Sequence, residues 1–188
     1  MTRKLLLVLS LAVLMVIPFQ AALAGEKAPQ KVFDLAQATL GPLGTDPVIV
    51  KAVAEENAKG KTLDQVKEMD EKWKATAGVA DYMQALMDSE CGKRLAEIKA
   101  SAPYYAEIFV MDNQGANVAM TDKTSDYWQG DEAKFQNSFA GGQGAVFVDE
   151  VEFDDSTQVY LVQVSVPVKD GDQVIGAITF GIDVDKIE

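Results

Sequence analysis

The chain has 188 residues, enough for one domain with a substantial core, and its 29 acidic residues outnumber its 17 basic ones. The resulting net charge of −12 argues against binding to nucleic acid or to an anionic membrane through general electrostatics. The absence of histidine removes the commonest general base and zinc ligand, and the single cysteine has no partner for an internal disulfide. We therefore expect no enzyme, no metal site and no cofactor.

The first residues predict a secretory signal peptide, residues 1–24. Arg3 and Lys4 precede the apolar run at 5–19, and the small-x-small cleavage motif ALA ends at residue 24. The run is shorter than the roughly 20 apolar residues of a membrane span. An uncleaved membrane anchor is the alternative. With cleavage, residues 25–188 are a periplasmic protein of net charge −14, because both basic residues are lost with the leader.

Residues 25–78 form a helical segment. The periodicity of the apolar residues predicts three helices, at 31–40, 48–58 and 63–74. Thr62 and Gln65 have the spacing of a capping box, which marks the start of the third helix. A longer helix is predicted at 79–100, where Gly92 weakens the middle.

From about residue 104 the pattern becomes that of β-strands. Alternating or continuous apolar residues predict strands at 106–112, 115–121, 145–153, 158–168 and 173–184. Tight turns join most of them, which indicates an antiparallel sheet and an α+β fold. The helix at 79–100 is expected to cover one face. The segment 122–144, with a short helix at 132–139, is expected to cross the other and to leave a concave space for a small ligand.

Residues 79–187 resemble the extracytoplasmic PAS-like sensor domains called PDC or Cache domains. The stretch EIFVMDNQGANVAMTDKTSDYWQGDEAKFQNSF is similar to their first hairpin and ligand loop, and VIGAITFGIDVDKI is similar to their closing strand. The resemblance implies a single Cache domain at 79–188, with a five-stranded antiparallel PAS-like sheet and helices on its N-terminal side. Because the sequence ends at Glu188, straight after the closing strand, we expect a stand-alone binding module and no transmembrane receptor.

The resemblance also implies a function and partners. It predicts a sensor of a small organic acid or amino acid that acts in signal transduction through a membrane sensor kinase or a chemoreceptor. It further implies pairing of two copies through the N-terminal helices. We prefer a small carboxylate, such as pyruvate, as the ligand. An amino acid or amine in the same pocket is the alternative, and so is a structural or docking protein that binds no ligand.

The candidate ligand-binding residues concentrate in the loop TSDYWQGDEAKF at 124–135. Tyr127 and Trp128 offer a hydroxyl and an indole N–H on flat apolar rings, and Gln129 offers a donor and an acceptor. Lys134 is the preferred partner of a ligand carboxylate, because few basic residues lie in this half of the chain. Core packing is the alternative for both rings, and a surface ion pair is the alternative for Lys134.

Four further residues complete the predicted site. Asp126 and Asp183 would bind the ligand if it is an amine, and Asp183 occupies a position that sometimes contacts ligand amines in the resembled family. Phe109 and Met111 on the first strand would form the floor of the pocket. Packing in the core explains these two apolar residues equally well.

Overall fold

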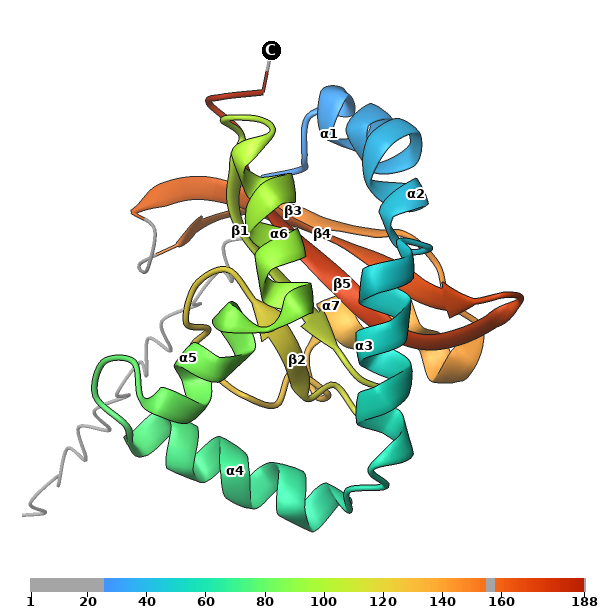
Figure 1. Cartoon of the computed structure of the whole chain (residues 1–188). Helices are drawn as coiled ribbons and strands as arrows, with labels where there is room; N and C mark the ends of the chain where they lie inside the picture. Colours follow the sequence, from blue (N-terminus) through green and yellow to red (C-terminus); the bar gives the residue numbers. More distant parts are fainter. Residues whose placement is uncertain (1–25, 155–157, 188) are drawn as a thin grey trace, which may run out of the picture.

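The computed structural model describes residues 26–154 and 158–187, so the predicted signal peptide lies outside the described residues. Helices come first along the chain and a five-stranded antiparallel sheet follows, as the sequence predicts (Figure 1). Among the described residues, no helix has both the length and the apolar character that a membrane crossing requires.

The helical half begins with an unbroken right-handed stretch that combines α1 (Gln30–Leu35), a π-helical turn (Ala36–Leu40) and α2 (Gly41–Leu43). The helices α3 (Pro47–Ala58) and α4 (Leu63–Ala75) follow. Both start at a side-chain cap. Asp46 accepts hydrogen bonds from the first-turn amides of α3, and Thr62 and Gln65 form the predicted capping box at α4.

The predicted single helix at 79–100 is wrong, because two helices occupy this range: α5 (Asp81–Asp88) and α6 (Glu90–Ala100). The break falls at Ser89 and not at Gly92. The Ser89 hydroxyl accepts the Gly92 amide at 2.9 Å, which caps α6. Glycine is required at 92, since a Cβ atom there would lie 2.2 Å from the carbonyl oxygen of Met87. The chain therefore turns at the junction and carries α5 toward the edge of the sheet.

The sheet contains five strands in the order β2-β1-β5-β4-β3. Their bounds are β1 Tyr105–Met111, β2 Asn117–Met120, β3 Phe147–Asp154, β4 Val159–Asp170 and β5 Gln173–Asp183. The last strand of the chain lies in the centre, and its residues from 174 to 183 are all buried. This arrangement confirms the five-stranded antiparallel sheet with N-terminal helices that the resemblance to PDC or Cache domains implies.

Each face of the sheet packs against different elements. Alternate residues of the central strands, such as Val164 and Phe180, join α1, α3 and α6 in one apolar cluster. The opposite face, with Phe109 and Met111, meets α4, the loop at 121–132 and α7 (Ala133–Phe139) in a second cluster. Figure 1 shows α3 and α6 in front of the sheet and α7 behind it. The connector at 122–144 thus crosses the second face, as predicted.

Helix α4 holds the loop at 121–132 through backbone atoms. The buried carboxylate of Asp70 accepts the amide of Tyr127 at 2.9 Å and that of Trp128 at 3.1 Å. The indole N–H of Trp73 donates to the carbonyl oxygen of Thr124 at 2.8 Å. Hydrogen bonds to a buried charged group are among the stronger stabilising contacts in proteins, so this helix fixes the position of the loop.

Replacing Asp70 should therefore loosen the loop and destabilise the protein. We expect Asp70→Ala to lower the free energy of unfolding by about 2 to 4 kcal/mol, because the amides of Tyr127 and Trp128 lose their acceptor. Urea unfolding measures the change. The matched control is Glu71→Ala, which removes the exposed neighbouring acid on the same helix. Equal stability of the two variants would show that Asp70 does not anchor the loop.

Candidate functional site

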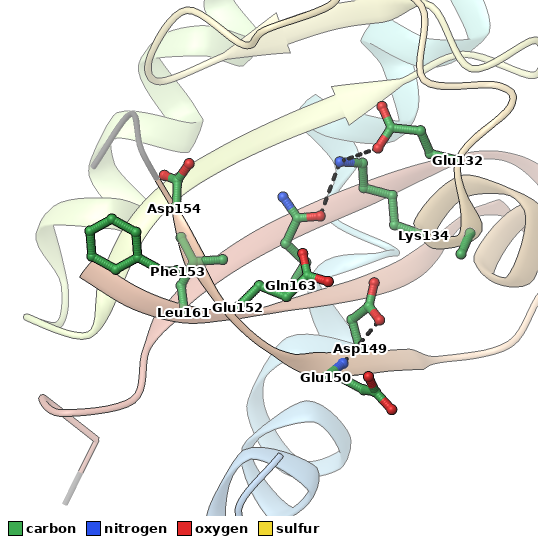
Figure 2. Close-up of a pocket in the computed structure, with 10 residues that line it drawn as sticks. Glu132, Lys134, Asp149, Glu150, Glu152, Phe153, Asp154, Leu161 and Gln163 are labelled. Carbon is green, nitrogen blue, oxygen red and sulfur yellow. Dashed lines mark hydrogen bonds and ion pairs between the residues drawn. The ribbon is translucent and has the colours of Figure 1, made fainter. Parts of the chain in front are cut away.

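Two adjoining cavities lie on the sheet face that α7 and the loop cover. The first has a volume of about 340 Å³ and is bordered by strand β3, so we call it the β3 cavity (Figure 2). The second has a volume of about 380 Å³ and is bordered by residues 123–129, so we call it the loop cavity. Lys134, Asp154 and Gln163 line both cavities and form the boundary between them.

A cross-strand row of three residues forms the floor between the cavities. Glu107 on β1 pairs with Gly181 on β5, which pairs with Gln163 on β4. Because Gly181 has no side chain, the two flanking side chains meet above it, and the Gln163 amide donates to a Glu107 oxygen at 3.3 Å. A Cβ atom at position 181 would lie 2.7 Å from the Glu107 Cγ atom. Glycine at this position is thus a condition for the contact.

Lys134 reaches the row from above, and it is buried. Helix α7 directs its Nζ atom toward the sheet, where Nζ donates to Gln163 Oε1 at 3.0 Å and pairs with Glu132 Oε2 at 2.8 Å (Figure 2). The ammonium also lies 5.5 Å from the centre of the Phe109 ring. Only 9% of this lysine is exposed, so the pair with Glu132 is not a simple surface ion pair.

The environment of Glu107 shifts the pKa of its carboxyl. Burial raises the pKa of its carboxyl above the ordinary value, and the nearby Asp154 carboxylate raises it further. Lys134 and the Gln163 hydrogen bond oppose this rise, and Asp122 adds to it. Within the described part of the chain, the carboxylate receives one hydrogen bond, at Oε1 from Gln163, and Oε2 receives none. A buried anion with an open oxygen is suited to bind a donor or a cation.

The walls carry far more negative than positive charge. Among the described residues that line the two cavities there are six acidic side chains and two lysines, Lys123 and Lys134. The Nζ atom of Lys123 already donates to the carbonyl oxygen of Thr76 at 2.7 Å. In residues 26–154 and 158–187, no three acidic or cysteine side chains gather in a way that suits a metal ion. Among the described residues, the acidic excess lies in the β3 cavity, which has five acidic side chains and one lysine, whereas the loop cavity has two of each.

Three of the residues predicted from the sequence line the cavities. Lys134 borders both, and Phe109 and Gln129 border the loop cavity. The Gln129 side chain is buried and donates to the carbonyl oxygen of Asp126 at 2.9 Å, so it stabilises the loop that it belongs to.

The two aromatic rings of the loop lie outside both cavities. The Tyr127 ring packs 5.6 Å from that of Trp73, and its hydroxyl accepts a hydrogen bond from Lys61 at 2.9 Å. The Trp128 indole N–H donates to the carbonyl oxygen of Gln114 at 2.8 Å. Both rings face α4 and the turn between β1 and β2, because the backbone clamp at Asp70 orients them away from the sheet centre.

The remaining predicted residues also lie apart from the cavities. Asp126 pairs with Lys74 at 3.2 Å, and Asp183 pairs with Lys186 at 2.8 Å. Met111 is fully buried in the second apolar cluster. Sequence reasoning missed Glu107, Gln163 and Asp154. The first two interrupt apolar strands with polar side chains that point to one face, and this interruption is the signal that marks them.

No protein-family model matches the chain, and no curated protein matches it. Similar solved structures include the sensor domain of the Vibrio cholerae histidine kinase DctB, with 15% identity, a TM-score of 0.44, and coverage of 83% of this chain and 50% of that one. The ligand-binding domain of the Campylobacter jejuni chemoreceptor Tlp3 in complex with L-valine has 15% identity, a TM-score of 0.41, and coverage of 85% and 66%. That of the Pseudomonas aeruginosa chemoreceptor PctC in complex with GABA has 12% identity, a TM-score of 0.37, and coverage of 85% and 63%. This chain spans between half and two thirds of the length of these three sensory or ligand-binding domains.

The raised pKa of Glu107 predicts how stability depends on pH. The folded protein holds the Glu107 proton at pH values where the unfolded chain has lost it, so stability falls as the pH rises through this range. We expect Glu107→Gln to remove this component, so that urea unfolding shows a smaller loss of stability from acidic to neutral pH. Parallel pH profiles for the two proteins would contradict the assignment.

Proposed function

We propose that the chain is an extracytoplasmic sensor module that binds a small organic molecule with a protonated amine, either an amino acid or an amine. The observation that carries the proposal is the buried Glu107 carboxylate, which has a neutral amide at one oxygen and no donor from the described residues at the other. An ammonium group in the loop cavity would compensate this charge. The resemblance to Cache domains supports a role in sensing.

An amine suits the site better than a lone carboxylate does. A carboxylate such as pyruvate needs a positive partner, and the Lys134 ammonium is already held by Glu132 and Gln163. It would also face the acidic wall of the β3 cavity. We therefore favour an amine, which the sequence allows as the alternative ligand. Phe109 supplies an apolar surface for its carbon skeleton.

Binding at this position offers a route to the rest of the molecule. A ligand in the loop cavity contacts the segment 123–129, and Asp70 and Trp73 fasten this segment to α4. A ligand that favours one arrangement of the loop would shift the population of α4 positions. A membrane sensor kinase or a chemoreceptor is the proposed partner that reads the shift. Pairing of two copies through the N-terminal helices stays a prediction.

Calorimetric titration with neutral amino acids, monoamines and small carboxylates tests the proposal. We expect saturable binding of an amine-bearing compound without its consumption. Glu107→Gln should weaken this binding about 10- to 100-fold, because a hydrogen-bonded charge pair is lost. Asp172→Asn, in the exposed turn between β4 and β5, is the matched control and should leave the affinity unchanged. Binding of pyruvate alone, or unchanged affinity in Glu107→Gln, would refute the amine assignment.

A further inference from the structure

The row of residues that contains Glu107 continues across the sheet to a second acidic position. Gln163 lies opposite an irregularity in β3, where the pairing shifts between Val148, which faces Val164, and Val151, which faces Val162. The two residues inside this bulge are Asp149 and Glu150. The line therefore crosses four strands. It runs from Glu107 on β1 over Gly181 on β5 and Gln163 on β4 to Asp149 and Glu150 on β3.

The two ends of this line face the same space. The Asp149 carboxylate lies on the side of β3 where Lys134 and Gln163 are, whereas the Glu150 carboxylate points to the other side (Figure 2). Asp149 borders the β3 cavity, and Glu107 borders the adjoining loop cavity. Three strand spacings separate their backbones, or about 14 Å. The Glu107 side chain extends toward the middle, where it accepts the Gln163 amide.

The centre of the line has a different character from its ends. The Lys134 ammonium stands above Gln163 between the two carboxylates, and the Phe109 ring and Leu161 supply apolar surface beside it. Glu132 pairs with this ammonium at 2.8 Å, so the centre holds an ion pair with apolar surface beside it. The two ends of the line are carboxylates, and its complement is a molecule with cationic ends and a hydrocarbon middle.

We propose that the two cavities together take a linear diamine, with one ammonium on Glu107 and the other on Asp149. This inference rests on the proposed function and specifies its ligand class. The main support is Glu107, which is nine-tenths buried and has an oxygen toward the loop cavity that accepts no hydrogen bond from the described residues.

The test is a calorimetric series on the whole protein with butylamine, putrescine, cadaverine and diaminooctane. We expect at least one diamine to bind about tenfold or more tightly than butylamine, since it gains a second charged contact.

Variants at the two ends separate the two contacts. Asp149→Asn should lower the affinity of the best diamine toward that of butylamine and leave butylamine binding unchanged, whereas Glu107→Gln should weaken both. Asparagine at 149 still accepts the Glu150 amide that Asp149 holds at 2.9 Å, so the bulge is preserved. Asp172→Asn is again the control.

The outcomes distinguish this inference from the proposed function. Equal affinities for butylamine and every diamine, or an Asp149→Asn variant with full diamine affinity, would overturn the two-point contact and leave the amine-binding site in place. A failure of all four compounds and of the neutral amino acids to bind would overturn both.

Discussion

The burial of one carboxylate organises the site. Removing Glu107 from water costs free energy unless a donor or a cation meets it, and the surrounding residues supply only part of that compensation. Gly181 clears the space above the central strand, Gln163 reaches across it, and Lys134 approaches from α7. These contacts leave one oxygen open and two cavities beside it. An ammonium group of the proposed ligand would relieve this cost.

The helical half of the chain belongs to the same packed unit as the sheet. Helices α1 and α3 complete the apolar cluster on one face, and α4 completes the cluster on the other. Through Asp70 and Trp73, α4 also sets the position of the loop that roofs the loop cavity. Residues before 79 thus shape the site although they do not line either cavity. A change in the loop and a change in α4 are mechanically coupled, because the contacts between them are hydrogen bonds at fixed backbone atoms.

Local patterns predicted the fold well, and they predicted the site less well for a physical reason. Periodicity and capping residues located the helices and all five strands, because these signals lie within a few residues of one another. The break at Ser89 was missed because the helical pattern of the sequence continues through this residue, although Ser89 caps a new helix. The rings of Tyr127 and Trp128 have suitable chemistry, but Asp70, more than fifty residues earlier in the chain, turns them toward α4. Glu107 and Gln163 lie on strands that are not adjacent. Their side chains meet only because Gly181, on the strand between them, has no side chain.

The way in which α4 fastens the loop has a consequence for how selectivity can change. Asp70 binds two amides and Trp73 binds a carbonyl, so these contacts use main-chain atoms that every amino acid except proline possesses. The Ser125 side chain borders the loop cavity and takes no part in these contacts, whereas the Gln129 side chain helps to hold the loop. A substitution of Ser125 can therefore change the wall of the cavity while the contacts to α4 stay intact. A fastening of this kind separates the evolution of specificity from the maintenance of the fold.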